Sequence, residues 1–384
     1  MTEGITTTHI GSLPRTPEIL DHLEESGTGE LPQSLVAEAT REVIERQAEV
    51  GIDVANNGEQ GRTGFHIHVL DRLSGFSGEG VAPFWGDVRD FPELAEAEFD
   101  YPDADPETGA PLRPAVTGPI EYQGEAAARA ELETFFESLE AAGADVEGTF
   151  MTAPSPGIVA TSLPNQHYDS HEEYLFAVAD ALRTEYGIIA DSEATLQVDA
   201  PDLMHTHHRE FHDGRSFQDL SVAEYREVVA THVEAINRAL GDVPAGEVRL
   251  HTCWGNYEGP HHRDIALADV LPELYELDVG TLAVEGSSPR HAHEYRAFEE
   301  HPLPGDMQLM PGVVDVKTNI IEHPETVADR LERAAEVVGD PSRIVAAPDC
   351  GFGTLAWSAA VEEIAWAKLE SLVEGAEIAS ERLG

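Results

Sequence analysis

The chain has 384 residues, 41% of them hydrophobic, which is enough to bury the core of one large globular domain or two ordinary ones. Its 73 acidic and 23 basic residues give a formal charge of −50, and such a surface excludes nucleic acid and anionic membranes as partners. No apolar run is long enough to span a membrane, and residues 1–5 lack the basic and apolar regions of a secretory signal, so we expect a cytoplasmic protein.

The acidic residues are spread along the whole chain within amphipathic segments, whereas an acidic disordered tail would gather them at one end. Only two basic residues are lysines, Lys317 and Lys368. We interpret this composition as the carboxylate-coated surface of a halophilic protein, because at 1 M salt screening acts over about 3 Å and removes self-repulsion.

The N-terminal part alternates strand and helix patterns. Residues 6–10 form a β-rich run that ends in a turn containing Gly11, Ser12 and Pro14. Apolar residues then recur at helical spacing over 32–50, and 51–59 has the pattern of a strand entering a turn.

Between residues 78 and 111 this pattern dissolves into proline, glycine, aspartate and aromatic residues. A structureless connection of this length inside a compact domain is typical of a functional loop or lid. We therefore predict an inserted loop over 78–111, with a decorative insertion as the alternative.

The remaining chain continues the alternation, with Ser221 as a candidate N-cap. The predicted strands share apolar runs that break at glycine, proline or an acid, and they are 114–119, 149–154, 195–201, 249–253, 282–285, 308–316 and 344–348. The predicted helices share apolar stripes, and they are 125–142, 170–191, 221–240, 265–277, 324–338 and 359–383.

Strict alternation of strand and helix argues for a parallel sheet, and the polar residues gather at strand ends, where the active sites of (β/α)₈ barrels lie. We predict a single (β/α)₈ TIM-type barrel over residues 1–384. Because the count is nine strands, one of them is expected to be accessory. A doubly wound sheet is the alternative, but no Gly-x-Gly-x-x-Gly and no P-loop motif is present.

His251 and Cys253 lie two apart on a predicted strand and so point to the same face. Glu285 and Cys350 stand at or just past the ends of two later strands. One histidine, two cysteines and a glutamate make a ligand set that suits zinc. The alternative is a pair of ordinary buried thiols beside a hydrogen-bonded core histidine.

A zinc ion held by two thiolates is poorly suited to activating water and well suited to holding a further thiolate. Coordination deprotonates a thiol that otherwise titrates near 8.5, and the sulfur stays nucleophilic. The site therefore points to S-alkylation rather than hydrolysis, with Glu285 as the ligand that an incoming thiol displaces most readily.

These residues resemble the zinc signature of the cobalamin-independent methionine synthase family, in the order His251-Thr252-Cys253, Glu285 and Pro348-Asp349-Cys350-Gly351. Further segments are similar to the opening, the second-strand acid and two later strands of that family's catalytic C-terminal barrel, and they are 7–15, 57–59, 197–201 and 311–315.

The resemblance implies zinc as cofactor and transfer of a methyl group to a zinc-bound thiol, homocysteine, to give methionine. Glu59 and Asp199 match acids that hold the amino group of homocysteine, with backbone orientation or arginine pairing as the alternative. Asp199 is also the candidate catalytic acid, and Ser12 and Trp254 are further candidates for substrate contact.

The sequence departs from the family pattern in two places. Lys317 stands where the synthases carry a histidine thought to donate a proton, which makes Lys317 a candidate catalytic residue. The long N-terminal half of the full-length synthases, which helps to hold folate, has no counterpart here. The methyl donor is therefore methyltetrahydrofolate or, more in keeping with the short relatives, a methyl-corrinoid protein.

Residues 253–262 and 318–325 look closer to the sub-branch that includes the epoxyalkane:coenzyme M transferase. One alternative function is therefore addition of coenzyme M to an epoxide, with Lys317, Arg15 or Arg290 meeting its sulfonate. The retained Glu59 and Asp199 favour an amino-acid thiol. A non-catalytic zinc-binding partner subunit is the third hypothesis.

A second polar cluster follows Asp199, from His205 through His207 and His208 to His212. We predict a loop that lines the pocket, with solvated histidines and a second metal site as alternatives. Trp254 and Tyr257 either wall the substrate cleft or pack.

Overall fold

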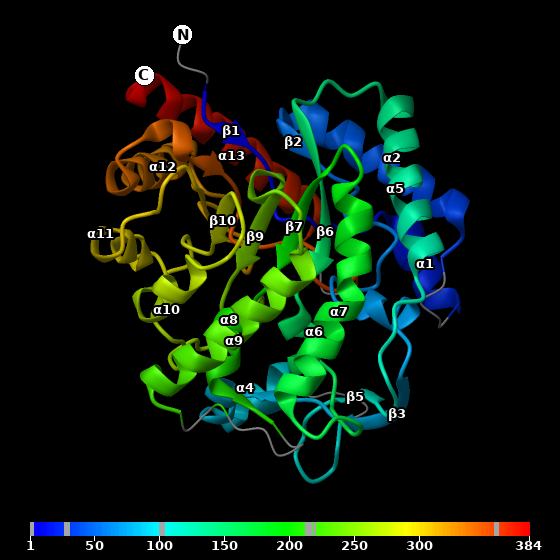
Figure 1. The fold of residues 1–384 in the computed structure, drawn as a ribbon. Helices are drawn as coiled ribbons and strands as arrows, with labels where there is room; N and C mark the ends of the chain where they lie inside the picture. The colour runs from blue at the N-terminus through cyan, green and yellow to red at the C-terminus, as the bar shows by residue number, and fades with distance from the viewer. Residues whose placement is uncertain (1–3, 27–30, 100–103, 212–216, 218–219, 357–360) are drawn as a thin grey trace.

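A computed structural model describes residues 4–26, 31–99, 104–211, 217, 220–356 and 361–384 of the chain. Its centre is a curled sheet of parallel strands (Figure 1). The pairing order is β11-β10-β9-β7-β6-β2, and the strands are β2 (Val54–Ala55), β6 (Gly148–Pro154), β7 (Thr195–Asp199), β9 (Val248–Thr252), β10 (Thr281–Val284) and β11 (Gln308–Pro311). The predicted α/β class with a parallel sheet is confirmed.

A second, two-stranded sheet pairs β1 (Thr6–Thr7) with β12 (Val345–Ala346), also in parallel. Isolated parallel bridges join this pair to both edges of the larger sheet. Thr8 pairs with Val54 at the β2 edge, and Gly312 pairs with Ala347 at the β11 edge. The chain's first and last strands are therefore neighbours although they are separated by most of the sequence.

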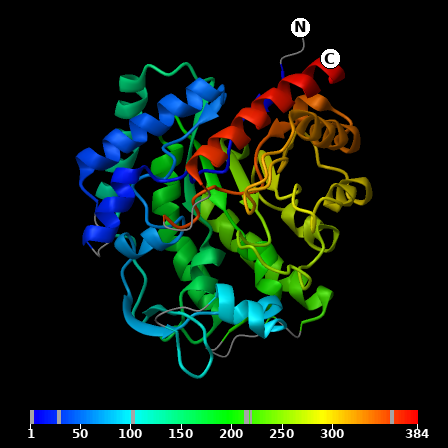
Figure 2. The same cartoon turned by 180° about the vertical axis from the view of Figure 1, so that it is seen from behind.

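Helices cover the outside of the sheet, with α2 and α5 along one side and α10, α11 and α12 along the other (Figure 1). Seen from behind, α13 lies between these two groups (Figure 2). The long helices are α1 (Pro17–Ser26), α2 (Gln33–Val50), α5 (Glu125–Ala142), α7 (His171–Ala190), α9 (Val222–Leu240), α10 (Leu267–Leu274), α12 (Pro324–Val338) and α13 (Glu362–Leu383). None of the described helices combines the length and apolar character needed to cross a bilayer.

Shorter helices fill the connections, and they are α3 (Gly86–Arg89), α4 (Pro92–Glu98), α6 (Pro156–Ser162), α8 (Asp202–His205) and α11 (Ala297–Glu300). The 3₁₀ turns are η1 (Ile67–Asp71), η2 (Thr206–His208), η3 (Ala245–Glu247), η4 (Glu294–Arg296) and η5 (Pro341–Arg343).

Local chemistry sets the helix ends. Ser221 caps α9 as predicted, and it forms a capping box with Glu224, so two backbone N–H groups that the helix leaves free are satisfied. Helix α2 ends at Gly51, whose φ of 91° is the left-handed conformation that glycine adopts without a Cβ clash.

The accessory strand of the nine predicted is the one after the insertion. It corresponds to β5 (Leu112–Val116), which pairs antiparallel with β3 (Phe76–Val81), outside the parallel sheet. A run of apolar residues does not reveal which strand it will pair with, and so the sequence left the choice open.

The prediction of a structureless segment over 78–111 is wrong for much of its length. The segment contains most of β3, the short β4 (Phe84–Trp85), α3 and α4. Strand β4 pairs antiparallel with β8 (Arg209–Glu210), which follows the Asp199 strand, and Phe84 packs with Val88 and Ala110 in a small apolar cluster of their own. A two-residue strand whose partner lies more than a hundred residues away leaves no local pattern in the sequence.

A buried ion network connects the chain on either side of this insertion to α5 and α7. Glu185 of α7 pairs with Arg72 and accepts a hydrogen bond of 2.8 Å from the Tyr122 hydroxyl. Arg72 also pairs with Glu131 of α5, which accepts a bond of 2.8 Å from Arg62 Nε. Breaking one member of such a network leaves a buried charge without a partner.

We expect the Glu185→Gln variant to lose about 3 kcal/mol of unfolding free energy at neutral pH. Burial alone would raise the pKa of Glu185, but Arg72 outweighs it and lowers that pKa from 4.5 to about 2. The ion pair therefore stabilises the fold above the ordinary pKa, and that contribution is lost as pH falls through about 4 towards 2. Denaturant unfolding across this range should show a shallower pH dependence in the variant than in wild type.

The matched control is Glu172→Gln, an exposed acid on the same helix. The unfolding free energy of this control should depend on pH as it does in wild type. If the unfolding free energy of Glu185→Gln also changed with pH as steeply as that of wild type, the role given to the ion pair would be contradicted.

Candidate active site

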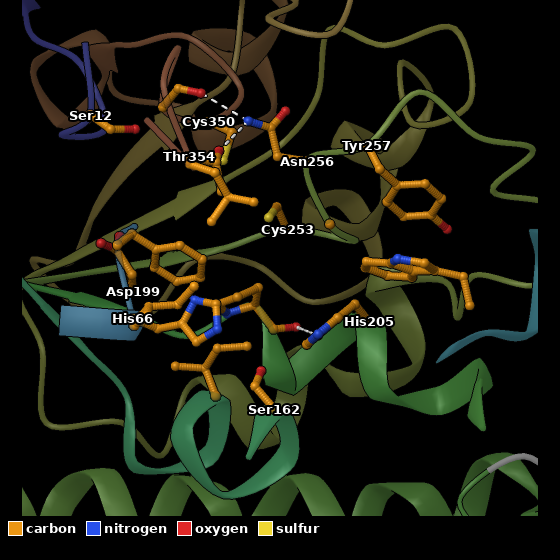
Figure 3. A pocket seen from close by; sticks show the side chains of 18 of the residues that line it. Ser12, His66, Ser162, Asp199, His205, Cys253, Asn256, Tyr257, Cys350 and Thr354 are labelled. Atoms are coloured by element: carbon orange, nitrogen blue, oxygen red, sulfur yellow. Dashed lines mark hydrogen bonds between the residues drawn. The ribbon is translucent and has the colours of Figure 1, made fainter. Parts of the chain in front are cut away.

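The ends of β9 and β12 bring three predicted metal ligands together. His251 lies in β9, Cys253 follows it, and Cys350 lies just beyond β12. One ligand atom from each of the three lies within 4.8 Å of the others, and His251 and Cys253 are both only 3% exposed. Figure 3 shows both cysteines at one wall of the cavity.

The donor atoms of this cluster are free to bind a cation. Neither ring nitrogen of His251 has a hydrogen-bond partner, although the side chain is buried. Burial, and then the nearby Arg249, lowers the pKa of His251 to about 3, so the imidazole is neutral. The Cys253 thiol beside it, together with burial, raises the pKa of Cys350 well above its ordinary value. The Cys350 thiol is therefore protonated in the absence of a cation. One nitrogen with two sulfurs forms a donor set suited to zinc.

Glu285, the fourth predicted ligand, lies outside the cluster in this structure. It follows β10, and one of its carboxylate oxygens accepts a hydrogen bond of 2.5 Å from Lys317 Nζ. The other oxygen, Oε2, is buried without a partner. The sequence motif identified the glutamate but did not reveal that the nearby lysine would pair with it.

Lys317 is held as a cation. Burial alone would lower its pKa, but the charges of Glu285 and Asp349 outweigh burial and raise it. A group whose pKa is raised above 10.5 is a weak proton donor near neutral pH. The geometry therefore favours an ion-pairing role for Lys317 over the predicted role in catalysis.

Two carboxylates face each other across the same strand ends. Glu59 follows β2 with a φ of 56°, and its Oε1 accepts a bond of 2.8 Å from Thr152 while its Oε2 is buried without a partner. Asp199 ends β7 and accepts a bond of 2.7 Å from Gln197. Burial, and then the charge of Glu59, raises the pKa of Asp199 well above its ordinary value. Arg62 Nη1 lies 4.0 Å from Glu59 Oε1, which agrees with the arginine-pairing alternative for that oxygen, while Glu59 Oε2 is left without a partner.

One cavity of about 740 Å³ is lined by the three clustered ligands His251, Cys253 and Cys350 and also by Lys317, Glu59 and Asp199. Glu285 does not line it. The inserted segment supplies part of its wall through Trp85 and Phe99, and Arg113 of β5 lines the cavity as well. Trp85 stacks on Tyr257 at 3.9 Å between ring centroids, and Arg209 lies 3.9 Å from the Trp85 ring centre. Residues of the segment 78–111 therefore line the cavity, and a function as a lid stays a prediction.

The remaining predicted residues take separate positions. Ser12 lines the cavity, and its Oγ lies so near Gly351 that a Cβ there would approach it to 2.1 Å. Tyr257 lines the cavity too. Trp254 does not: it is fully buried, donates to the Ile265 carbonyl at 2.7 Å and stacks on His291, so its position supports the packing alternative.

The histidines that follow Asp199 do not all lie in the same place. His205 lines the cavity, as predicted for this loop, with its Nδ1 2.6 Å from the Pro201 carbonyl oxygen. His208 is buried and does not line the cavity, and its Nε2 lies 3.0 Å from Asp264 Oδ1. His212 lies outside the described residues.

Sequence reasoning missed several wall residues. His66 is half-buried, its buried Nδ1 has no hydrogen-bond partner, and desolvation lowers the pKa of the ring to about 3. Asn256 donates to the Gly351 carbonyl at 2.9 Å and to Thr354, which ties the loop after Cys253 to the loop after Cys350 (Figure 3). No local pattern distinguishes His66 among the 18 histidines.

Comparison with known proteins gives one consistent family. The model of the cobalamin-independent synthase catalytic domain matches residues 5–79 and 113–376, and the unmatched residues 80–112 nearly coincide with the inserted segment 78–111. The methionine synthase of Thermococcus kodakarensis is 26% identical over 382 residues, which cover 98% of this chain and 94% of that protein. The methionine synthase of Saccharolobus solfataricus is also 26% identical, covering 98% and 95%.

Solved structures show the same fold. The B12-independent methionine synthase of Shewanella sp. W3-18-1, in complex with selenomethionine, aligns with a TM-score of 0.71 at 20% identity and covers 99% of both chains. A putative vitamin-B12 independent methionine synthase from Listeria monocytogenes aligns with a TM-score of 0.63 at 21% identity. With the family model matched over most of its length, this chain belongs to the cobalamin-independent methionine synthase family, through that family's catalytic domain.

Proposed function

We propose that this protein is a zinc-dependent S-methyltransferase that forms methionine from homocysteine. The observation that carries the proposal is the buried nitrogen and sulfur cluster of His251, Cys253 and Cys350, which opens onto the same cavity as Glu59 and Asp199. The metal and the acceptor's amino group thus have separate sets of residues at neighbouring strand ends.

The three clustered side chains are proposed to hold zinc, with Glu285 as a further ligand when Lys317 releases it. Zinc in a site of this kind lowers the pKa of a coordinated thiol and leaves its sulfur nucleophilic. In the reaction the S–CH₃ bond forms as the donor's bond to that methyl group breaks, and the thiol proton is released. The apolar and aromatic wall around the cluster excludes water, so water does not compete with the sulfur as acceptor of the methyl group.

Glu59 and Asp199 are proposed to bind the ammonium group of homocysteine. Two buried carboxylates repel each other, and an ammonium ion between them relieves that repulsion while it satisfies the partnerless Glu59 Oε2. This pairing also selects against coenzyme M, which lacks an amine. In this structure Lys317 is paired with Glu285, so a sulfonate would have to compete with that carboxylate for the lysine.

The donor is proposed to be methyltetrahydrofolate or a methyl-corrinoid protein. A cavity of about 740 Å³ is within the range of sites for small organic ligands. Its stacked Trp85 and Tyr257 offer an aromatic surface for a planar ring.

We infer that the two parallel sheets together form a (β/α)₈ barrel built as a single domain. The supporting observations are the bridge from Thr8 to Val54 and the bridge from Gly312 to Ala347, which link the β1-β12 pair to both edges of the six-stranded sheet. The candidate site at the carboxyl ends of these strands is where such barrels carry their chemistry.

The test is methionine formation by the zinc-loaded protein with homocysteine and, in separate reactions, methylcobalamin, methyltetrahydrofolate and its polyglutamate. Product from at least one donor supports the proposal and identifies the donor class. Alkylation of coenzyme M by an epoxide in place of methionine formation would favour the alternative transferase. Zinc binding without alkylation of either thiol would favour a non-catalytic partner subunit.

We also propose that the protein is halophilic and expect its melting temperature to rise between low and molar KCl. The charge of −50 repels itself at low salt, and screening removes this cost. Differential scanning calorimetry at about 0.1 and 2 M KCl should show an increase of at least about 5 °C. An unchanged or lower melting temperature in 2 M KCl would contradict a halophilic surface.

A further inference from the structure

We propose a second, structural metal site, formed by His208, His261, Asp264 and His291. These residues come from η2, from the loop after β9 and from the loop after β10. The ligand we assign is one divalent transition-metal ion, with zinc as the best match to three imidazoles and a carboxylate.

His261 and His291 meet one oxygen of Asp264, and His208 lies beside the other oxygen. Asp264 Oδ2 lies 2.8 Å from His261 Nδ1 and 2.9 Å from His291 Nε2, while Asp264 Oδ1 lies 3.0 Å from His208 Nε2. The donor atoms of His261, Asp264 and His291 all lie within 4.8 Å of one another. All four side chains are buried, and that of Asp264 is 1% exposed.

Each histidine presents its second ring nitrogen to an oxygen outside the cluster. His261 Nε2 lies 3.1 Å from the Tyr257 carbonyl oxygen, and His208 Nδ1 lies 3.5 Å from Asp87 Oδ1. His291 Nδ1 lies 4.0 Å from Glu294 Oε1. Of these three contacts only that of His261 is a hydrogen bond, since the Nδ1 atoms of His208 and His291 have no hydrogen-bond partner. In metal-binding histidines an outer N–H of this kind donates to an oxygen and directs the inner lone pair at the metal.

The same arrangement is unfavourable for neutral histidines without a cation. If the inner nitrogens carry the protons, His261 and His291 donate to Asp264 Oδ2, but the outer lone pair of His261 then faces the Tyr257 carbonyl oxygen at 3.1 Å. If the outer nitrogens carry the protons, three inner lone pairs face one carboxylate, and acceptors then oppose acceptors. If both nitrogens of each ring carry protons, three cations are buried together, which costs desolvation free energy. One divalent ion at the centre satisfies every inner nitrogen and the carboxylate at once. In agreement, His208 Nε2 and Asp264 Oδ1 lie 3.0 Å apart without hydrogen-bond geometry.

The site is closed, as structural zinc sites are. The four residues are not among those that line the large cavity, so a bound ion has four protein ligands and no route to substrate. His291 stacks on Trp254 at 3.7 Å, and Trp254 directly follows Cys253. An ion here would fix the loops after β7, β9 and β10 beneath the candidate active site.

The test is the zinc content of untagged protein, measured by mass spectrometry, together with zinc X-ray absorption. Wild type should hold about two zinc ions per chain, and the double variant Cys253→Ser/Cys350→Ser should hold about one. Absorption from that double variant should show only nitrogen and oxygen neighbours. Asp264→Asn should also hold about one ion, now with sulfur neighbours.

The control is His293→Gln, which removes an exposed histidine two residues from His291 and should keep the wild-type zinc content. The proposal is overturned if the cysteine double variant, with wild-type circular dichroism, holds no zinc, or if Asp264→Asn binds as much as wild type. These outcomes are separable from failure of the proposed function. A protein whose single zinc survives loss of both cysteines would retain this site and lose the catalytic one.

Discussion

Replacing Cys350 with serine is expected to remove one zinc ion per chain and to abolish methionine formation. Changes to residues that merely support a metal ligand cost about 10- to 100-fold in affinity, so loss of a sulfur ligand should cost more than about 100-fold. Serine keeps the size of the side chain but is a poor ligand for zinc at neutral pH. Competitive zinc titration with a chromophoric chelator measures the affinity, and product assay measures the activity.

Cys253→Ser should behave in the same way, because the two sulfurs belong to one cluster with His251. The control is Val222→Ala, an exposed change that should leave zinc affinity and activity unchanged. If Cys350→Ser bound zinc as tightly as wild type and kept full activity, the sulfur cluster would not be the catalytic metal centre.

The second large effect is expected from Asp199→Asn, which should raise the KM for homocysteine by about 30-fold. The variant keeps the hydrogen-bonding shape of the side chain but removes the charge that we assign to the ammonium group. Steady-state kinetics with homocysteine as the varied substrate measure the change. Glu59→Gln should act in the same direction, because its partnerless Oε2 belongs to the same pair.

Zinc affinity should not change in either variant, since neither acid belongs to the nitrogen and sulfur cluster. Glu107→Gln, an exposed acid in the inserted segment, is the matched control and should leave the KM unaltered. An unchanged KM in both Asp199→Asn and Glu59→Gln would argue that the two acids orient local structure and do not bind the acceptor.

The sequence predicted the repeating elements well because each is encoded locally. The bounds of α5 and α12 follow from their apolar stripes, and the start of α9 follows from the capping chemistry of Ser221. The proximity of His251, Cys253 and Cys350 also followed, since ends of parallel strands meet at one edge of a sheet.

What the sequence did not reveal depends on contacts between distant residues. Glu285 was assigned to the metal, but whether a carboxylate binds a metal or a lysine depends on which group lies nearest in space, and Lys317 lies there. Trp254 has the same apolar pattern whether it packs or lines a cavity. The pairing of β4 with β8 joins two-residue strands that show no periodicity.

The placement of Trp85 and Phe99 has a consequence for how this scaffold diversifies. Both belong to the stretch 80–112 that the family model leaves unmatched, yet they line the same cavity as the sulfur ligands. If the methyl donor binds against this wall as proposed, the residues that recognise the donor lie in a segment separate from the strands that carry the sulfur ligands. Exchanging this segment between homologues should then change the preference for the methyl donor while the sulfur ligands stay the same.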